Sequence, residues 1–245
     1  MVYKLMLNRL VADSRFSILD YGTCLSFVAD DDVALAAYPT ALNGSSTITM
    51  AAWVYINEKN GLQGVMGMRN GETDSSFYIL DLGNGSFEVR FRNSAGNNFD
   101  IQPVSGIYAR WFHMACVING TNMYAYINGE LKASKTDAAG TFGTNTTGFY
   151  VGKTPQGSGG FFNLTGKVDD VLLYNKALTQ TEVRSLHLGR GYASNPLIHW
   201  NFNEGSGGTA IDQSGNGNNG TITGASFSDQ VFCTTRSVSG TRTLA

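Results

Sequence analysis

The sequence predicts an all-β protein: a sandwich of two antiparallel sheets with one short helix. The segments between turns are short runs that are apolar throughout or alternate apolar and polar residues, as strands do. Asn-Gly is the preferred pair for a tight hairpin turn, because both of its residues need positive φ. Eight such pairs divide the 245 residues, at Asn43, Asn60, Asn70, Asn84, Asn119, Asn128, Asn216 and Asn219. Many short strands with frequent turns are typical of a sandwich or barrel.

The clearest strands lie in the stretch 111–132, WFHMACVINGTNMYAYINGELK. Its first strand is apolar on both faces, so we expect it to be buried and its His113 to be structural. Asn119-Gly120 ends this strand and residues 123–127 form a second one. Asn128-Gly129 then turns the chain into a third strand at 130–132.

Further strands are expected at 22–33, 48–56, 64–68, 76–82, 87–92, 99–104, 148–152 and 166–174. The first is short and ends in an acidic turn. The strand at 87–92 alternates aromatic or aliphatic residues with charged ones, so one of its faces should contact water. Between 152 and 166 the chain contains PQGSGGFFNL, which lacks the spacing of a phosphate-binding loop. We expect a turn that displays aromatic side chains there.

One helix is predicted after residue 178. Thr179 and Glu182 have the spacing of a capping box, and Leu178 and Val183 that of a hydrophobic staple. Gly189 is expected to form the C-terminal cap.

The composition excludes several classes of partner. The net charge is −2 and no basic run is present, which argues against nucleic acid. No apolar segment reaches the roughly 18 residues that a membrane span needs, and the first 15 residues do not form a convincing signal peptide. Charged residues are 15%, against a usual share of about 25%.

Three cysteines, Cys24, Cys116 and Cys233, do not make a disulfide framework. Cys116 lies in an apolar strand and is expected to be a buried free thiol. A Cys24–Cys233 pair is an alternative to two further free thiols.

Five segments resemble the laminin-G-like jelly rolls of the concanavalin A-like lectin/glucanase superfamily. They follow the family's order and cover about residues 22–188: GTCLSFVADDDV, ITMAAWVYI, WFHMACVINGTNMYAYINGELKA, FYVGK and GKVDDVLLYNKALTQTEVRSL. The resemblance implies a jelly-roll fold but no single function, because this fold serves many purposes.

The stretch 197–225 resembles the segment with which family members often begin. Its position at the back suggests a circular permutation, in which it supplies the missing first strand; the alternative is the stub of a second copy. We therefore expect Ile198, Trp200 and Phe202 to be buried. Residues 22–228 would form the sandwich, 1–21 an N-terminal arm or added strand, and 229–245 a C-terminal arm.

No catalytic residues are predicted. The glucanases of this superfamily carry a Glu-x-Asp-x-Glu strand that supplies the acid and the nucleophile, and this sequence has none. The acidic residues on the expected strands are spaced differently: Glu88, Glu130, Asp169 and Asp170. We expect a protein that is not an enzyme.

A structural calcium ion is predicted near Asp212. The run from Asp212 to Gly220 is rich in oxygen donors, with Asn216 and Asn218 as further candidates. Asp169 or Asp170 would supply a second carboxylate, because one of them must share a face with apolar neighbours. Similar sites in the resembled family hold calcium. The alternative is that Asp212 only caps a turn and that one aspartate of the pair binds backbone amides.

Four aromatic residues are candidates for glycan binding, since sugars stack on exposed aromatic faces: Tyr55, Tyr78, Phe161 and Phe162. Trp53, Trp111 and Trp200 are expected in the core or half-buried.

These observations predict a non-catalytic binding or assembly protein. One hypothesis is a structural or decorating component, a surface or fibre module, of a phage virion. Its partners would be other subunits of a homo-oligomer or of the virion shell, and its location the virion surface. The missing leader, the two ends outside the family pattern and the few cysteines favour it. The alternative is a secreted, extracellular carbohydrate-binding module that binds a surface polysaccharide.

Overall fold

The computed structural model describes residues 22–58, 61–69, 75–103, 106–137, 140–145, 147–156, 159–191, 193 and 195–229. The predicted N-terminal arm, nearly all of the predicted C-terminal arm, and Cys233 with its alternative pairing to Cys24 lie outside these residues. Cys24 is a buried free thiol.

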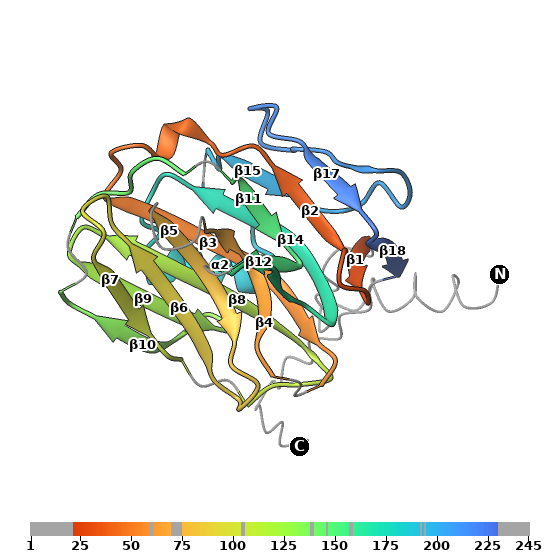
Figure 1. Cartoon of the computed structure of the whole chain (residues 1–245), viewed down its shortest axis with the longest axis horizontal. Helices are drawn as coiled ribbons and strands as arrows, with labels where there is room; N and C mark the ends of the chain where they lie inside the picture. The colour runs from red at the N-terminus through yellow and green to blue at the C-terminus, as the bar shows by residue number, and fades with distance from the viewer. Residues whose placement is uncertain are drawn as a thin grey trace, which may run out of the picture.

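The described chain folds into two eight-stranded antiparallel sheets that form a sandwich, as the sequence predicts (Figure 1). Sheet A has the strand order β10 (Glu130–Lys135), β9 (Asn122–Ile127), β8 (Trp111–Asn119), β3 (Thr47–Ile56), β14 (Gly166–Tyr174), β1 (Thr23–Phe27) and β18 (Ser226–Asp229), with β15 (Ile198–Trp200) also paired to β14. Sheet B has the order β16 (Thr209–Ala210), β17 (Gly220–Thr223), β2 (Val33–Ala36), β11 (Phe149–Val151), β4 (Gln63–Met68), β5 (Ser76–Asp81), β6 (Phe87–Arg92) and β7 (Asn98–Ile101). A short helical turn, η1 (Thr40–Leu42), precedes β3.

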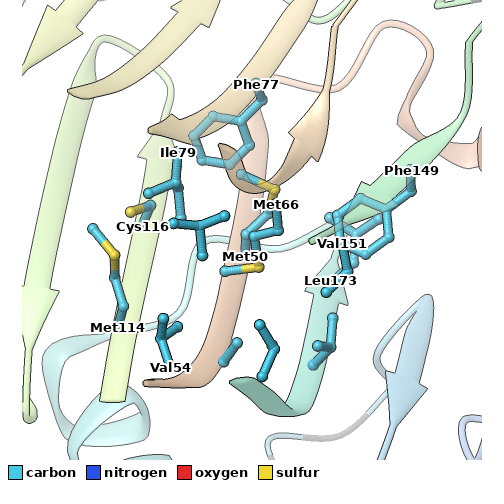
Figure 2. Close-up of a cluster of buried hydrophobic side chains, with 14 of the residues drawn as sticks. Met50, Val54, Met66, Phe77, Ile79, Met114, Cys116, Phe149, Val151 and Leu173 are labelled. Carbon is cyan, nitrogen blue, oxygen red and sulfur yellow. The ribbon is translucent and has the colours of Figure 1, made fainter. Parts of the chain in front are cut away.

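The main hydrophobic core lies between the two sheets. Strand residues that alternate along each chain point into it, because successive side chains of a strand face opposite sides. Figure 2 shows this for Met50 and Val54 of β3, Met66 of β4 and Phe77 and Ile79 of β5. Full burial of one such side chain stabilises the fold by about 1.5–3 kcal/mol.

Cys116 of β8 lies in the same core and is a free thiol, which confirms the prediction for it. Burial raises the pKa of this thiol.

A second hydrophobic cluster covers the outer face of sheet A. Helix α2 (Gln180–His187) packs Val183 and Leu186 against residues such as Ala51 and Tyr174. The predicted capping box is present, since Glu182 N donates to Thr179 Oγ1 and Thr179 N donates to the Glu182 carboxylate.

Gly189 follows this helix with a φ of 61°, and its N–H donates to the Leu186 carbonyl, which matches the predicted cap. The outer face of sheet B has no helix on it within the described residues.

The stretch 197–225 is built into both sheets. Its first strand, β15, pairs with β14, while β16 and β17 extend sheet B beyond β2. The expected burial of Ile198, Trp200 and Phe202 is confirmed, because each is 0% exposed. The permutation as the origin of this arrangement remains a prediction.

The structure adds two features that the sequence did not predict. The expected acidic turn after β1 leads into a separate strand, β2. The Gly-rich segment that we expected to be only a turn contains a two-stranded hairpin, β12 (Lys153–Pro155) and β13 (Phe161–Asn163). The strand expected at 99–104 is shorter, as β7.

Candidate functional site

The β12–β13 hairpin begins directly after Gly152 and lies against β4 of sheet B. This glycine has a φ of 89°, which a residue with a side chain adopts rarely. Its N–H donates to Val65 O of β4, which ties the start of the hairpin to sheet B. Its carbonyl accepts from Leu164 N, which joins the two ends of the hairpin to each other. Gly64 of β4 allows the hairpin to lie close, because a Cβ there would come within 2.4 Å of Thr154 N.

One side of the hairpin presents an aromatic ring to solvent. Lys153 pairs with Asn163 and Pro155 pairs with Phe161 across the hairpin, so these four side chains share a face. Phe161 is 39% exposed. The centroid of the Tyr150 ring lies 6.0 Å from that of Phe161, and Lys153 Nζ lies 4.4 Å from the same centroid.

Asn163 completes this surface. Its Oδ1 atom is buried and accepts no hydrogen bond within the part of the chain that the structure describes. A buried acceptor without a donor costs free energy. Because this atom is covered, a ligand hydroxyl could donate to it only after the Asn163 side chain turns outward. We call Tyr150, Lys153, Phe161 and Asn163 the hairpin face.

The other side of the hairpin packs on sheet B. The guanidinium carbon of Arg69 lies 5.8 Å from the Phe162 ring centroid and 4.8 Å from that of Tyr78. Arg90 also lies over Tyr78, at 5.9 Å, and donates from Nη2 to Asp100 at 3.0 Å. That hydrogen bond raises the pKa of Arg90, and burial raises that of Tyr78.

The four residues predicted to bind glycans therefore differ in exposure and position. Phe161 is exposed and Phe162 is half-buried beside it. Tyr78 is 1% exposed, so its ring faces are covered in this conformation and cannot stack with a sugar. Tyr55 lies on the opposite sheet, with its ring 5.7 Å from that of Trp111.

Sequence reasoning missed Tyr150, Lys153 and Asn163. Lys153 and Asn163 are ten residues apart, and only the hairpin pairing brings them to one face. The sequence would have predicted this pairing only if two short strands had been assigned within the Gly-rich segment.

The carboxylate of Asp212 accepts the hydrogen bonds that hold the loop between β16 and β17. Its Oδ1 accepts from His199 N and Ser214 N, and its Oδ2 accepts from Ser214 Oγ and Asn218 N. Burial raises the pKa of Asp212 and these hydrogen bonds lower it. The net effect is a pKa below the usual value for aspartate. The side chains of Asn216 and Asn218 donate to Leu197 O.

These contacts match the capping alternative for Asp212. Two carboxylate oxygens offer about four acceptor positions, so a calcium ion would have to displace some of the four donors. Within the described residues, no group of three or more His, Cys, Asp and Glu side chains could hold a metal ion. The calcium site remains a prediction.

The two strand aspartates take different positions because β14 has a bulge between Asp169 and Leu172. Asp169 is buried and lies opposite Trp53 of β3. Asp170 has a φ of 48°, and its Oδ1 lies 3.4 Å from Nε2 of His199. Adjacent strand residues already point to opposite faces, and the bulge in addition takes Asp170 out of the pairing with β3.

Comparison with known families agrees with this two-sheet sandwich. Residues 28–184 match the Laminin_G_3 family model, described as the concanavalin A-like lectin/glucanases superfamily. The chain belongs to this superfamily. The match confirms the resemblance inferred from the sequence. Comparison with curated proteins gives no match.

Several solved structures resemble this chain in fold. A candidate carbohydrate-binding protein from Bacteroides ovatus ATCC 8483 is 19% identical over 86% of this chain, with a TM-score of 0.67. The chain spans 60% of that protein's length. The CBM40 domain of the Ruminococcus gnavus IT-sialidase, bound to α2,3 sialyllactose, is 14% identical over 70% of this chain and 100% of its own, with a TM-score of 0.56.

A third similar structure is a heptameric SAP-like pentraxin from Limulus polyphemus. It is 16% identical over 86% of this chain and 93% of its own, with a TM-score of 0.51. At these identities the likeness shows a shared fold alone. Within the described residues of this superfamily member, none of the helices has the length and apolar character to cross a membrane.

Proposed function

We propose that this protein is a non-catalytic carbohydrate-binding protein and that the hairpin face binds the sugar. The observation that carries the proposal is the exposed ring of Phe161, with Tyr150 beside it and the Asn163 side chain on the same face of the hairpin. Sugar sites combine an apolar surface with a few placed polar groups. An aromatic ring supplies the first, and an amide beside it can exchange hydrogen bonds with sugar hydroxyls.

The similar structures support this proposal. The Bacteroides ovatus protein is described as a candidate carbohydrate-binding protein, and the CBM40 domain was solved with a bound sialyllactose. A fold can serve other functions, so the proposal depends on the residues of the hairpin face.

The test is binding to a printed glycan array by the wild-type protein, Phe161→Ala and Tyr55→Ala. The wild type should bind a subset of glycans, and Phe161→Ala should lose most of that signal. Tyr55→Ala is the matched control, because it removes an aromatic ring of similar size from the opposite sheet. Equal binding by the wild type and Phe161→Ala would overturn the proposed site.

Catalysis is tested separately. We expect no release of reducing sugar from any glycan that binds, since no glucanase-type carboxylate strand is present in the sequence. Release that increases in proportion to protein concentration would contradict the non-catalytic part of the proposal.

A place on a phage virion remains a second candidate. Strands β1 and β18 lie side by side, with Thr23 opposite Asp229, so the chain enters and leaves the described body at one edge of sheet A. This suits attachment to a larger assembly from one edge, with sheet B still open to a surface polysaccharide. Immunogold labelling of phage particles from the native source would test the virion role. Unlabelled particles, with the protein found only in the particle-free medium, would favour the secreted module.

A further inference from the structure

We propose that the hairpin face prefers carbohydrates that carry an anionic group, a carboxylate or a sulfate, and that Lys153 binds this group. This inference rests on the proposed function, because it names the class of sugar that the same face would take.

Lys153 differs from most lysines of the described chain in its partners. Lys132, Lys135 and Lys176 each pair with a carboxylate, at 2.8, 3.3 and 2.6 Å from Glu130, Asp137 and Glu182. Lys153 has no carboxylate within 4 Å in the part of the chain that the structure describes, and its recorded contact is with the Phe161 ring. Lys167 also lacks a carboxylate partner there, but it lies on sheet A, opposite Tyr55.

The position of Lys153 makes its charge available to a ligand on the ring. Its Nζ lies over the Phe161 ring, 4.4 Å from the centroid, so an anionic group on a sugar that contacts the exposed edge of that ring would come within reach of the ammonium group. The cation–π contact holds the flexible lysine side chain near the ring before a ligand arrives. Ordering a side chain in advance reduces the entropy that binding must overcome.

The overall charge of the protein would not produce such a preference. The sequence has a net charge of −2, so the protein as a whole does not attract anions. A preference for acidic sugars must therefore arise from local cations, and Lys153 is the cation on the hairpin face.

The experiment measures affinity by calorimetry for matched oligosaccharides. Each glycan that binds on the array is tested in three forms: neutral, carrying one carboxylate, and carrying one sulfate. In 50 mM NaCl the wild type should bind the better anionic form about three- to tenfold more tightly than the neutral form, the scale of one partly exposed ion pair with a hydrogen bond. The difference should shrink in 300 mM NaCl because salt screens exposed charges.

The variants assign the effect to one residue. Lys153→Gln should remove the preference while retaining binding of the neutral form, and Lys153→Arg should keep it. Lys167→Gln is the matched control and should behave as the wild type. The comparison of the carboxylated and sulfated forms identifies which anion the face accepts better.

Three outcomes would overturn the inference. If the neutral and anionic forms bind equally and Phe161→Ala still abolishes binding, the preference fails and the proposed function stands. If the preference persists in Lys153→Gln, another residue binds the anion. If the wild type binds no glycan of the array, both proposals fail.

Discussion

Buried acidic residues in this protein mostly hold loops together. Asp32 accepts hydrogen bonds from the N–H groups of Val28 and Ala29, and Asp212 accepts four. Burying a carboxylate is costly unless donors surround it, and backbone amides provide them here. Charged residues make up only 15% of the chain, and buried carboxylates such as those of Asp32 and Asp212 cap the loops whose N–H groups donate to them.

His113 should make stability depend on pH. It lies with Trp53 and His187 between sheet A and helix α2, is 2% exposed, and its Nδ1 has no hydrogen-bond partner in the described chain. Burial, and to a lesser degree His187, lowers the pKa of His113 from 6.5 to about 3. Below pH 6.5 the unfolded chain takes up a proton that the folded chain does not, so stability is lost as pH falls from about 6.5 to about 3.

Urea unfolding at pH 7.5 and pH 5 measures this effect. His113 should lower the free energy of unfolding by about 2 kcal/mol between these values, at about 1.4 kcal/mol per pH unit below 6.5. His113→Gln should show a smaller loss, with the remainder due to other groups such as His187, whose pKa burial also lowers. The same pH dependence in wild type and variant would contradict this account.

At the scale of elements, side chains close the turns that join the strands. The loop between β16 and β17 is closed by Asp212, whose backbone N–H donates to Asn219 Oδ1 while its carboxylate accepts from the loop. This loop also connects to β15, because His199 N donates to the same carboxylate. One side chain thus ties β15 of sheet A to a loop of sheet B.

Asp212→Ala tests both this role and the predicted calcium ion. Loss of four hydrogen bonds to one carboxylate should cost about 2–4 kcal/mol of unfolding free energy when both proteins are measured in EDTA, so that no bound ion contributes. Asp137→Ala is the control, because Asp137 makes one exposed pair with Lys135 and should cost little. If EDTA lowers the melting temperature of the wild type but not of Asp212→Ala, a calcium ion at this site would be established by linkage.

For the whole molecule, the last described segment completes the sandwich. Trp200 packs its ring 5.7 Å from that of Phe149 and 6.2 Å from that of Phe202, and its Nε1 donates to Asn218 O. Gly220 passes close to this ring, since a Cβ there would lie 2.7 Å from it. Segments far apart in the chain therefore share one core.

Truncation after Asn195 should remove this support. It deletes β15 to β18 with the large buried side chains of Ile198, Trp200 and Phe202, each worth about 1.5–3 kcal/mol, so the loss is a large share of a normal domain's stability. Thermal unfolding followed by circular dichroism should show a much lower melting temperature or no cooperative transition. Trp200→Ala in the full chain is a less severe test and should lower the free energy of unfolding by about 3–5 kcal/mol. An unchanged melting temperature in the truncated protein would reject the role of this segment.

The sequence by itself determined the fold class, most strands, the helix with both caps, and the superfamily. These features depend on local signals: alternating side chains, Asn-Gly turns, and the spacing of Thr179, Glu182 and Gly189. It also indicated that Phe161 could present an aromatic face.

Only the tertiary structure decided which residues accompany Phe161 and which candidates are covered. The hairpin pairing places Lys153 and Asn163 beside it, and the two arginines on Tyr78 cover that ring. Likewise, the bulge in β14 gives Asp169 and Asp170 different surroundings, and backbone donors surround Asp212. Exposure and hydrogen bonding depend on which strands become neighbours, and long-range pairing has no signal in the spacing of residues along the chain.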